Sequence, residues 1–592
     1  MANLATLDWV IVIFFLLLFV GIGVSFRRKA GGNLTAFFLG GRNLPWYIAG
    51  VSMVATTFAA DTPLWVTEKI AQHGISGNWL WWNMLIGGML TTFFFARLWR
   101  RAEILTELEL LELRYSGMVA RLLRGVKAVY LGLFLNVVII GWVNAALISI
   151  IEVFFEVPYM TAFWVTAAAM VLVSLYSSVA GLLGIAMTDF AQFIIAMAGC
   201  IILAVIVMNL PEVGGAEGLK AKLPAWRLDF FPRIGGSELA VGTFSLSAGA
   251  FFSYIGLQWW ASWYPGNEPG GGGYISQRMM SARDEKNAIY SSLFFQIAHY
   301  ALRPWPWIIV GLCALVLYPD LPLEESRKGF IMVMRDFLPD GIKGLLFVGF
   351  LSAYMSTIST QLNWGSSYLT NDLYKRFLRP SESFTNESEA QKTYVRAGRI
   401  ITLIIMAVAL GVTSQITMID SAAKFLIASG AGLGMVLILR WYWWRINAWS
   451  ELVATIAPIV GLLIANFLLP KILPETFFEQ NGAFIFTVLF TTVAWLTATL
   501  LTSPTDTNVL QAFYERVKPG GWWRPFRKDG RSESKMAFLF TSWLSGVVMV
   551  YSILFFIGYW ILEFWNLFWL NLSLAIVSFI ILRWGMKRAG IS

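Results

Sequence analysis

A row of small and hydroxyl-bearing side chains lies within an apolar stretch at residues 344–374. Its members follow the spacing i, i+3, i+4 and i+7 of one helix face: Ala353, Ser356, Thr357 and Thr360. A single hydroxyl in an apolar helix usually bonds to its own backbone, whereas a whole row suggests contact with a group that needs oxygen. Hard cations are such groups, because they are held by carbonyl, hydroxyl and carboxylate oxygens. The spacing therefore predicts a helix face that binds a small cation such as Na⁺.

An apolar helix of this length is typical of a membrane protein, and the composition of the chain indicates one. The chain has 592 residues, of which 57% are hydrophobic and 13% are charged, with a mean hydropathy of +0.66. A soluble protein carries about 25% charged residues. Two cysteines and two histidines without metal-ligand spacing argue against a disulfide framework, a zinc site or a haem site. The net charge of +9 follows from membrane topology, so no nucleic-acid partner is expected.

Fifteen apolar spans are expected, which makes the chain an all-α polytopic membrane protein with about 15 transmembrane helices in a lipid bilayer. Their approximate bounds are 8–26, 45–72, 78–99, 122–151, 159–178, 183–209, 240–264, 288–318, 341–373, 394–416, 420–446, 449–470, 482–503, 536–558 and 563–586. With the N-terminus outside, most of the 44 Lys and Arg residues fall in inward-facing segments, as the positive-inside rule requires. Three basic residues follow the first span, whereas a cleaved signal peptide has its charges before the apolar run. We therefore expect an integral plasma-membrane protein of the bacterial inner membrane, with the N-terminus outside and the C-terminus cytoplasmic.

Two of the expected helices are interrupted at membrane depth. The stretch 55–63 contains three threonines, an aspartate and a proline, and the stretch 260–273 is rich in proline and glycine. Unpaired backbone groups at that depth are tolerated only where they line a cavity or bind a ligand. Interruptions at corresponding places in two halves indicate inverted repeats around a central site. Five spans from 45 to 209 and five from 240 to 446 fit such halves. An alternative is that Pro63 merely kinks a structural helix.

Four segments carry a resemblance to a known family. They are GRNLPWYIAGVSMVATTFAAD at 41–61, SSVAGLLGIAMTDFAQ at 177–192, YISQRMMSARDEKNA at 274–288 and LSAYMSTISTQLNWGSSYLTNDLY at 351–374. Through them the chain, over about residues 8–470, resembles the sodium/solute symporters, which include bacterial proline, galactose and sialic acid transporters. The resemblance implies a LeuT-type fold with a five-plus-five inverted repeat. The expected parts are an extra helix and inner loop at 1–40, a first repeat at 41–210, an outer loop at 211–239, a second repeat at 240–447, and additional C-terminal helices at 448–592 with a basic inner loop at 504–535.

The resemblance also implies a sodium site that joins the first interruption to the eighth core helix. Carried over residue by residue, its ligands are the backbone carbonyls of Ala55, Phe58 and Ala353 and the hydroxyls of Ser356 and Thr357. Some members bind a second sodium, whose ligands would fall on Asp189, Ser356, Ser359 and Thr360. A carboxylate within a span is costly unless it is paired or hydrated, so Asp189 either binds this ion or faces a hydrated inner vestibule. The expected cofactor is Na⁺, as one ion or two, with no transition metal.

Candidates for solute contact come from several helices. The polar residues Thr57, Asp61 and Thr62 stand where sugar-transporting members contact their substrate. Further candidates are Asn83, Gln258, Trp263, Arg303 and Lys424. The two cations lie within spans and could bind a substrate carboxylate. Lys424 could instead extend to the interface, and Arg303 could bond carbonyls freed by its neighbouring prolines. The glycine-rich segment 265–273 departs from the family pattern, so its role stays open.

The sequence thus favours a sodium-coupled secondary active symporter that imports a small polar organic solute by alternating access. Two alternatives stay open: a transporter-like membrane sensor of a solute, and a proton-coupled symporter. The hydroxyls at positions 356 and 357 favour sodium over protons. An enzyme is not expected, because the sequence has no Ser-His-Asp, His-box or paired-carboxylate arrangement. The identity of the solute and the oligomeric state do not follow from the sequence.

Overall fold

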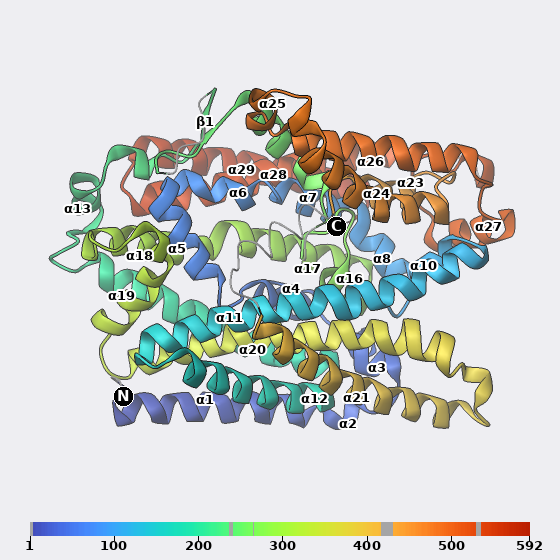
Figure 1. Cartoon of the computed structure of the whole chain (residues 1–592), viewed down its shortest axis with the longest axis horizontal. Helices are drawn as coiled ribbons and strands as arrows, with labels where there is room; N and C mark the ends of the chain where they lie inside the picture. The colour runs from blue at the N-terminus through green and yellow to red at the C-terminus, as the bar shows by residue number, and fades with distance from the viewer. Residues whose placement is uncertain (1–3, 236–240, 264–265, 416–429, 528–533, 592) are drawn as a thin grey trace.

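The computed structural model shows a bundle whose long helices lie side by side along the long axis of the molecule (Figure 1). It describes residues 4–235, 241–263, 266–415, 430–527 and 534–591. The longer helices are α1 (Thr6–Ser25), α10 (Gly117–Val129), α11 (Asn136–Phe155), α12 (Tyr159–Met208), α17 (Glu285–Ile297), α18 (Pro304–Leu317), α20 (Ile342–Tyr368), α21 (Glu387–Thr413), α24 (Ala448–Phe467), α26 (Gly482–Leu501), α28 (Ser534–Ile561) and α29 (Trp565–Ala589). Two short strands, β1 (Arg233–Ile234) and β2 (Ser245–Leu246), pair in parallel.

Shorter helices connect and fill the bundle. They are α2 (Arg27–Ala30), α3 (Leu34–Leu39), α4 (Trp46–Thr57), α5 (Thr62–His73), α6 (Trp79–Trp82), α7 (Leu85–Leu90), α8 (Ala96–Ala102), α9 (Glu109–Arg114), α13 (Gly215–Lys222), α14 (Ala248–Phe252), α15 (Trp259–Ala261), α16 (Gly273–Ser281), α19 (Gly329–Phe337), α23 (Gly434–Tyr442), α25 (Glu475–Glu479) and α27 (Thr507–Val517). In Figure 1, α1, α12, α20 and α21 form one side of the molecule, and α26, α28 and α29 form the opposite side. The helices α4, α16 and α17 lie between these two sides (Figure 1).

The expectation of an integral membrane protein is confirmed. In the described ranges, ten helical segments are long and apolar enough to cross a membrane. They are Thr6–Ala30, Gly117–Phe155, Tyr159–Met208, Glu285–Leu317, Ile342–Leu378, Glu387–Thr413, Ala448–Lys471, Gly482–Leu501, Lys535–Ile561 and Trp565–Ala589. Large apolar side chains such as Leu17, Phe467 and Leu501 point out of the bundle and are exposed, as lipid contact requires.

The expected number of about fifteen transmembrane helices stays a prediction, because these ten segments do not correspond one to one with the expected spans. Three expected spans, 45–72, 78–99 and 240–264, are divided into short helices. Two others, 159–178 and 183–209, are the arms of α12, which meet at Gly181. Gly181 has φ 59° and ψ −179°, and a Cβ atom there would lie 2.7 Å from the Cβ of Ala30. Glycine is therefore required where the arms meet. Part of the expected span 420–446 lies outside the described residues.

The first predicted interruption is present. Helix α4 ends at Thr57 and α5 begins at Thr62, so four residues between them are non-helical. Phe58 has φ −93° and ψ 76°, and Pro63 lies in the first turn of α5, where proline is tolerated because its missing N–H has no helical partner. The alternative of a continuous, merely kinked helix is thus wrong.

The second predicted interruption is also present. The helix pieces α14 and α15 precede it, and α16 follows it at Gly273. Gly273 has φ 54°, and a Cβ atom there would lie 2.6 Å from Oε1 of Glu268. Its backbone N–H donates to Oε2 of Glu107 over 2.7 Å. The glycines of segment 265–273 therefore allow a tight connection around buried carboxylates. The bounds of the two repeats, 41–210 and 240–447, stay a prediction.

Helix α20 is the most enclosed long element of the described chain. Every residue of α20 from Leu346 to Tyr368 is buried, hydroxyl-bearing residues included. The helices α12, α4, α11 and α21 pack around it. A helix with polar groups that is buried on all sides must satisfy those groups by contacts with its neighbours. These contacts define the site described below.

The N-terminus of α20 is held by a carboxylate from α1. Asp8 is fully buried, and its Oδ1 accepts hydrogen bonds from the backbone N–H groups of Gly341 and Gly344, each over 2.7 Å. These N–H groups have no partner within the helix, and the helix dipole favours a negative charge at this end. Replacing Asp8 by alanine is expected to cost about 3 kcal/mol of stability, since its two charge-assisted hydrogen bonds to the start of α20 are lost. A thermal unfolding scan of the detergent-solubilised protein measures this loss.

The matched control for this prediction is Asp320→Ala, which removes an exposed carboxylate. Its unfolding temperature is expected to stay within a degree or two of the unsubstituted protein, because exposed substitutions away from special features have small effects. Equal unfolding temperatures for Asp8→Ala and Asp320→Ala would show that the carboxylate of Asp8 does not stabilise α20.

Candidate functional site

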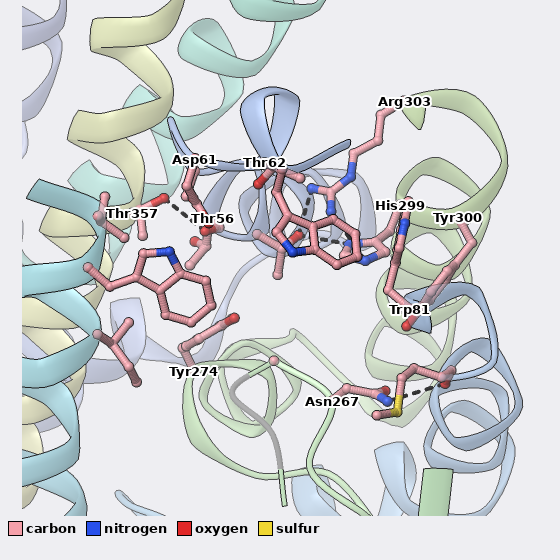
Figure 2. Close-up of a pocket in the computed structure, with 18 of the residues that line it drawn as sticks. Thr56, Asp61, Thr62, Trp81, Asn267, Tyr274, His299, Tyr300, Arg303 and Thr357 are labelled. Carbon is pink, nitrogen blue, oxygen red and sulfur yellow. Dashed lines mark hydrogen bonds between the residues drawn. The ribbon is translucent and has the colours of Figure 1, made fainter. Parts of the chain in front are cut away.

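The first interruption borders a cavity of about 230 Å³ (Figure 2). Five of the predicted solute contacts line it: Thr57, Asp61, Thr62, Gln258 and Arg303. Thr56 and Thr357 also line it, so the same cavity reaches the predicted sodium face of α20. In Figure 2, Thr357 lies on one side of the cavity and Arg303 and His299 lie on the other. The structure therefore brings the predicted solute and sodium residues together around four non-helical residues.

Two of the predicted solute contacts, Asn83 and Trp263, are not part of the cavity lining. The side-chain amide of Asn83 donates to the backbone oxygens of Trp79 and Leu80, within its own helical region. Trp263 is buried and packs against Gly430, away from the cavity lining. Lys424 lies outside the described residues. Asn83 and Trp263 therefore have contacts that a structural role explains.

Arg303 is placed by contacts with the broken helix. Its Nη1 donates to the hydroxyl of Thr57 over 3.1 Å and to the backbone oxygen of Val54 over 3.3 Å. Its guanidinium carbon lies 5.3 Å from the ring centre of Trp307, within range of a cation–π contact. Arg303 thus both lines the cavity and bonds a carbonyl near the end of α4. The bonded carbonyl lies in α4, in another helix, and not beside the prolines next to Arg303.

His299 lies one helical turn before Arg303, on the same face. Its Nε2 lies 3.2 Å from Nη2 of Arg303, and its Nδ1 lies 3.0 Å from the hydroxyl of Thr57. A guanidinium can only donate, so Nε2 accepts and Nδ1 carries the proton of a neutral imidazole. The spacing of His299 and Arg303 at i and i+4 is a sequence signal for this pairing that the prediction did not use. His299 is a functional candidate that the sequence analysis missed.

Asp61 supplies the opposite charge. It lies between the two halves of the broken helix, and its Oδ1 is enclosed and has no hydrogen-bond partner within the described ranges. Aromatic side chains form much of the remaining wall, namely Trp65, Trp81, Trp142, Tyr274 and Tyr300. Flat aromatic faces suit rings and the apolar parts of small molecules. Two residues of the glycine-rich segment, Gly266 and Asn267, also line the cavity.

Two of the predicted sodium residues, Thr357 and Ser356, contact the neighbouring helices α4 and α12. The hydroxyl of Thr357 donates to the backbone oxygen of Thr56 over 2.9 Å and to that of Ala353 over 3.1 Å. The hydroxyl of Ser356 donates to Oδ1 of Asp189 over 2.7 Å. The donor set is entirely oxygen, which suits a hard cation. A direct contact therefore links the row predicted from periodicity to the broken helix.

Comparison with known proteins identifies the family. The sequence model of the sodium:solute symporter family matches residues 37–458, so the chain belongs to this family. It is 25% identical over 473 residues to the sodium/proline symporter of Salmonella typhimurium, with 77% of this chain and 88% of the relative covered. The sodium/proline symporter of Staphylococcus aureus is 25% identical over 444 residues, with 73% of this chain and 80% of the relative covered.

The fold also has a solved relative. A Na⁺-coupled sialic acid symporter in a substrate-bound outward-open state superimposes with a TM-score of 0.66 at 19% identity, covering 85% of this chain and all of that chain. The predicted LeuT-type fold is thus confirmed. The family and fold are those of transporters, and they support sodium-coupled symport of a small solute across a membrane.

Proposed function

We propose that the protein is a sodium-coupled symporter that imports a small zwitterionic solute by alternating access, with its N-terminus outside and its C-terminus in the cytoplasm of a bacterium. The observation that carries this proposal is the double role of the first interruption. Its threonines contact α20 on one side and Arg303 on the other. Residues that hold the ion and residues that hold the solute therefore share one segment of backbone.

Sodium is a co-transported substrate in this proposal. The backbone carbonyls of Ala55, Phe58 and Ala353 and the hydroxyls of Ser356 and Thr357 would hold it. Backbone carbonyls at the break of a discontinuous helix coordinate sodium in transporters of this kind. The described side-chain oxygens at this place are all buried, so they can replace a hydration shell.

The charges of the cavity support a zwitterionic solute. Arg303 offers a guanidinium that binds a carboxylate, and Asp61 offers an enclosed oxygen that binds an ammonium group. Neutral His299 adds no further charge. A solute with one positive and one negative group would place each group next to a residue of opposite charge, whereas a dicarboxylate would place a second negative charge in the enclosed site of Asp61. The aromatic wall suits a compact apolar body, and the two named relatives transport proline, a solute of this kind.

Transport by purified protein in proteoliposomes tests the proposal. An inward sodium gradient is expected to drive concentrative uptake of radiolabelled zwitterionic amino acids, with proline as the first probe. One net charge moved inward across 100 mV supplies about 2.3 kcal/mol, on the order of fiftyfold accumulation. Equal sodium on both sides, and a proton gradient without sodium, are the controls. Uptake driven by protons alone, or uptake of sugars in preference to zwitterions, would contradict the proposal, and binding without uptake would favour a sensor.

A further inference from the structure

A second group of charged side chains is buried beside the predicted sodium face. Asp189 on α12 and Arg278 on α16 are both fully buried. Nη2 of Arg278 lies 3.7 Å from Oδ2 of Asp189. Neither residue lines the solute cavity, so the solute proposal gives this ion pair no role.

The guanidinium of Arg278 joins four helices. Its Nε donates to the hydroxyl of Ser52 on α4 over 3.1 Å, and that hydroxyl donates to Oδ2 of Asp189 over 2.5 Å. Its Nη2 donates to the hydroxyl of Thr360 on α20 over 2.6 Å. Its Nη1 donates to Oε1 of Gln277 over 2.8 Å. The positive charge is thus surrounded by oxygen atoms from α4, α12, α16 and α20.

This cluster contains the residues that, by the resemblance to the family, would hold a second sodium ion. Asp189 accepts from Ser356 and Ser52 as well as facing Arg278. Thr360 accepts from Arg278 and lies 3.0 Å from the hydroxyl of Thr56. The hydroxyl of Ser359 donates to the backbone oxygen of Ser356 over 3.1 Å. Every one of these side-chain oxygens therefore has a partner within the protein.

The charges of Asp189 and Arg278 also balance each other. One carboxylate faces one guanidinium, and both are shielded from water. A sodium ion added here would be a second positive charge next to the guanidinium, in a place where like charges are not screened. An arginine side chain keeps its charge throughout the accessible pH range, so this cation is permanent.

We propose that Arg278 is a fixed internal cation that takes the place of a second sodium ion, so that one Na⁺ accompanies each solute. The inference rests on the proposed function, because it concerns the number of ions in sodium-coupled symport. It assigns Arg278 the role of setting stoichiometry, and it assigns Asp189 to a permanent ion pair in place of transient ion binding.

Sodium binding measured directly on the purified protein tests this. Equilibrium binding of ²²Na⁺ to the detergent-solubilised full chain is expected to saturate at one ion per protein. In proteoliposomes, the reversal potential of coupled transport is expected to change with the sodium gradient as one ion per solute requires. Two ions bound, or a reversal potential for two ions per solute, would overturn the inference and leave sodium-coupled symport standing. Binding of no sodium at all would overturn both.

Variants make the test specific to Arg278. Arg278→Gln frees Asp189, so the number of bound ions is expected to rise from one to two. Arg278→Lys keeps the charge and is expected to bind one ion. The double variant Arg278→Gln with Asp189→Asn leaves no charge in the cluster, and it is expected to return to one ion. If the Arg278→Gln protein is folded and monodisperse and still binds one sodium ion, the proposal that Arg278 takes the place of a second sodium ion is wrong. The wild-type count decides the stoichiometry even where a variant does not fold.

Discussion

Replacing Thr357 by alanine is expected to raise the sodium concentration for half-maximal uptake at least tenfold. The hydroxyl of Thr357 makes a side-chain contact between α20 and the last turn of α4, through the backbone oxygen of Thr56 at 2.9 Å. It is also one of the proposed sodium ligands. Loss of a ligand worth about 1.4 kcal/mol corresponds to a factor of ten in affinity. Ser356→Ala is expected to act in the same direction, with an added effect because Ser356 also donates to Asp189. Sodium titrations of initial uptake rates in proteoliposomes measure both.

Two variants control for general damage to α20. Thr357→Ser keeps the hydroxyl and is expected to keep sodium affinity within a factor of about three, or roughly 0.6 kcal/mol. Ser366→Ala removes a buried hydroxyl on the same helix that donates to the backbone oxygen of Asn363, within α20 itself. Its sodium dependence is expected to match that of the unsubstituted protein. Unchanged half-saturation in both Thr357→Ala and Ser356→Ala, with normal membrane insertion, would remove these hydroxyls from the sodium site.

The second large effect is expected at the two charges of the cavity. Arg303→Gln and Asp61→Asn should each lower kcat/KM for a zwitterionic solute by roughly thirtyfold or more. Removing one partner of a buried charge pair costs about 2–5 kcal/mol, because the remaining charge is left unpaired. Uptake of the radiolabelled solute at saturating sodium separates this loss from any change in sodium affinity.

Solute analogues show which charge each residue binds. In Arg303→Gln, an analogue whose carboxylate is replaced by a carboxamide is expected to lose less uptake than the zwitterion does. In Asp61→Asn, uptake of an analogue without the ammonium group is expected to fall less than uptake of the zwitterion does. Arg588→Gln, at an exposed position of α29, is the control for removal of a cation. Equal losses for all analogues in both variants would mean that these residues support the fold and do not contact the solute.

Local patterns predicted the parts of the site that lie within one helix. The i, i+3, i+4 and i+7 spacing found the oxygen-bearing face of α20, and the threonines and Pro63 found the break after Thr57. The fold followed from motifs that resemble those of the family, and the family match confirms it. These features could be predicted from the sequence because they are determined by residues that lie close together along one helix.

Contacts between distant helices could not be predicted in the same way. The pairing of Asp189 with Arg278 joins α12 to α16, and nothing in either segment identifies its partner. Asn83 and Trp263 were selected for residue type and helix, yet their orientation turns them from the cavity. The expected spans 159–178 and 183–209 separate at the place where the arms of α12 meet, because apolarity falls at the glycine-containing turn there.

The four non-helical residues after Thr57 have a thermodynamic consequence. These residues border both the proposed sodium site and the proposed solute site. When one ligand orders them, the second ligand binds with a smaller loss of conformational entropy. Any factor by which sodium tightens the binding of solute must then equal the factor by which solute tightens the binding of sodium. A calorimetric cycle with the two ligands added in either order should therefore close, and the size of the shared coupling free energy would measure how strongly this short linker connects them.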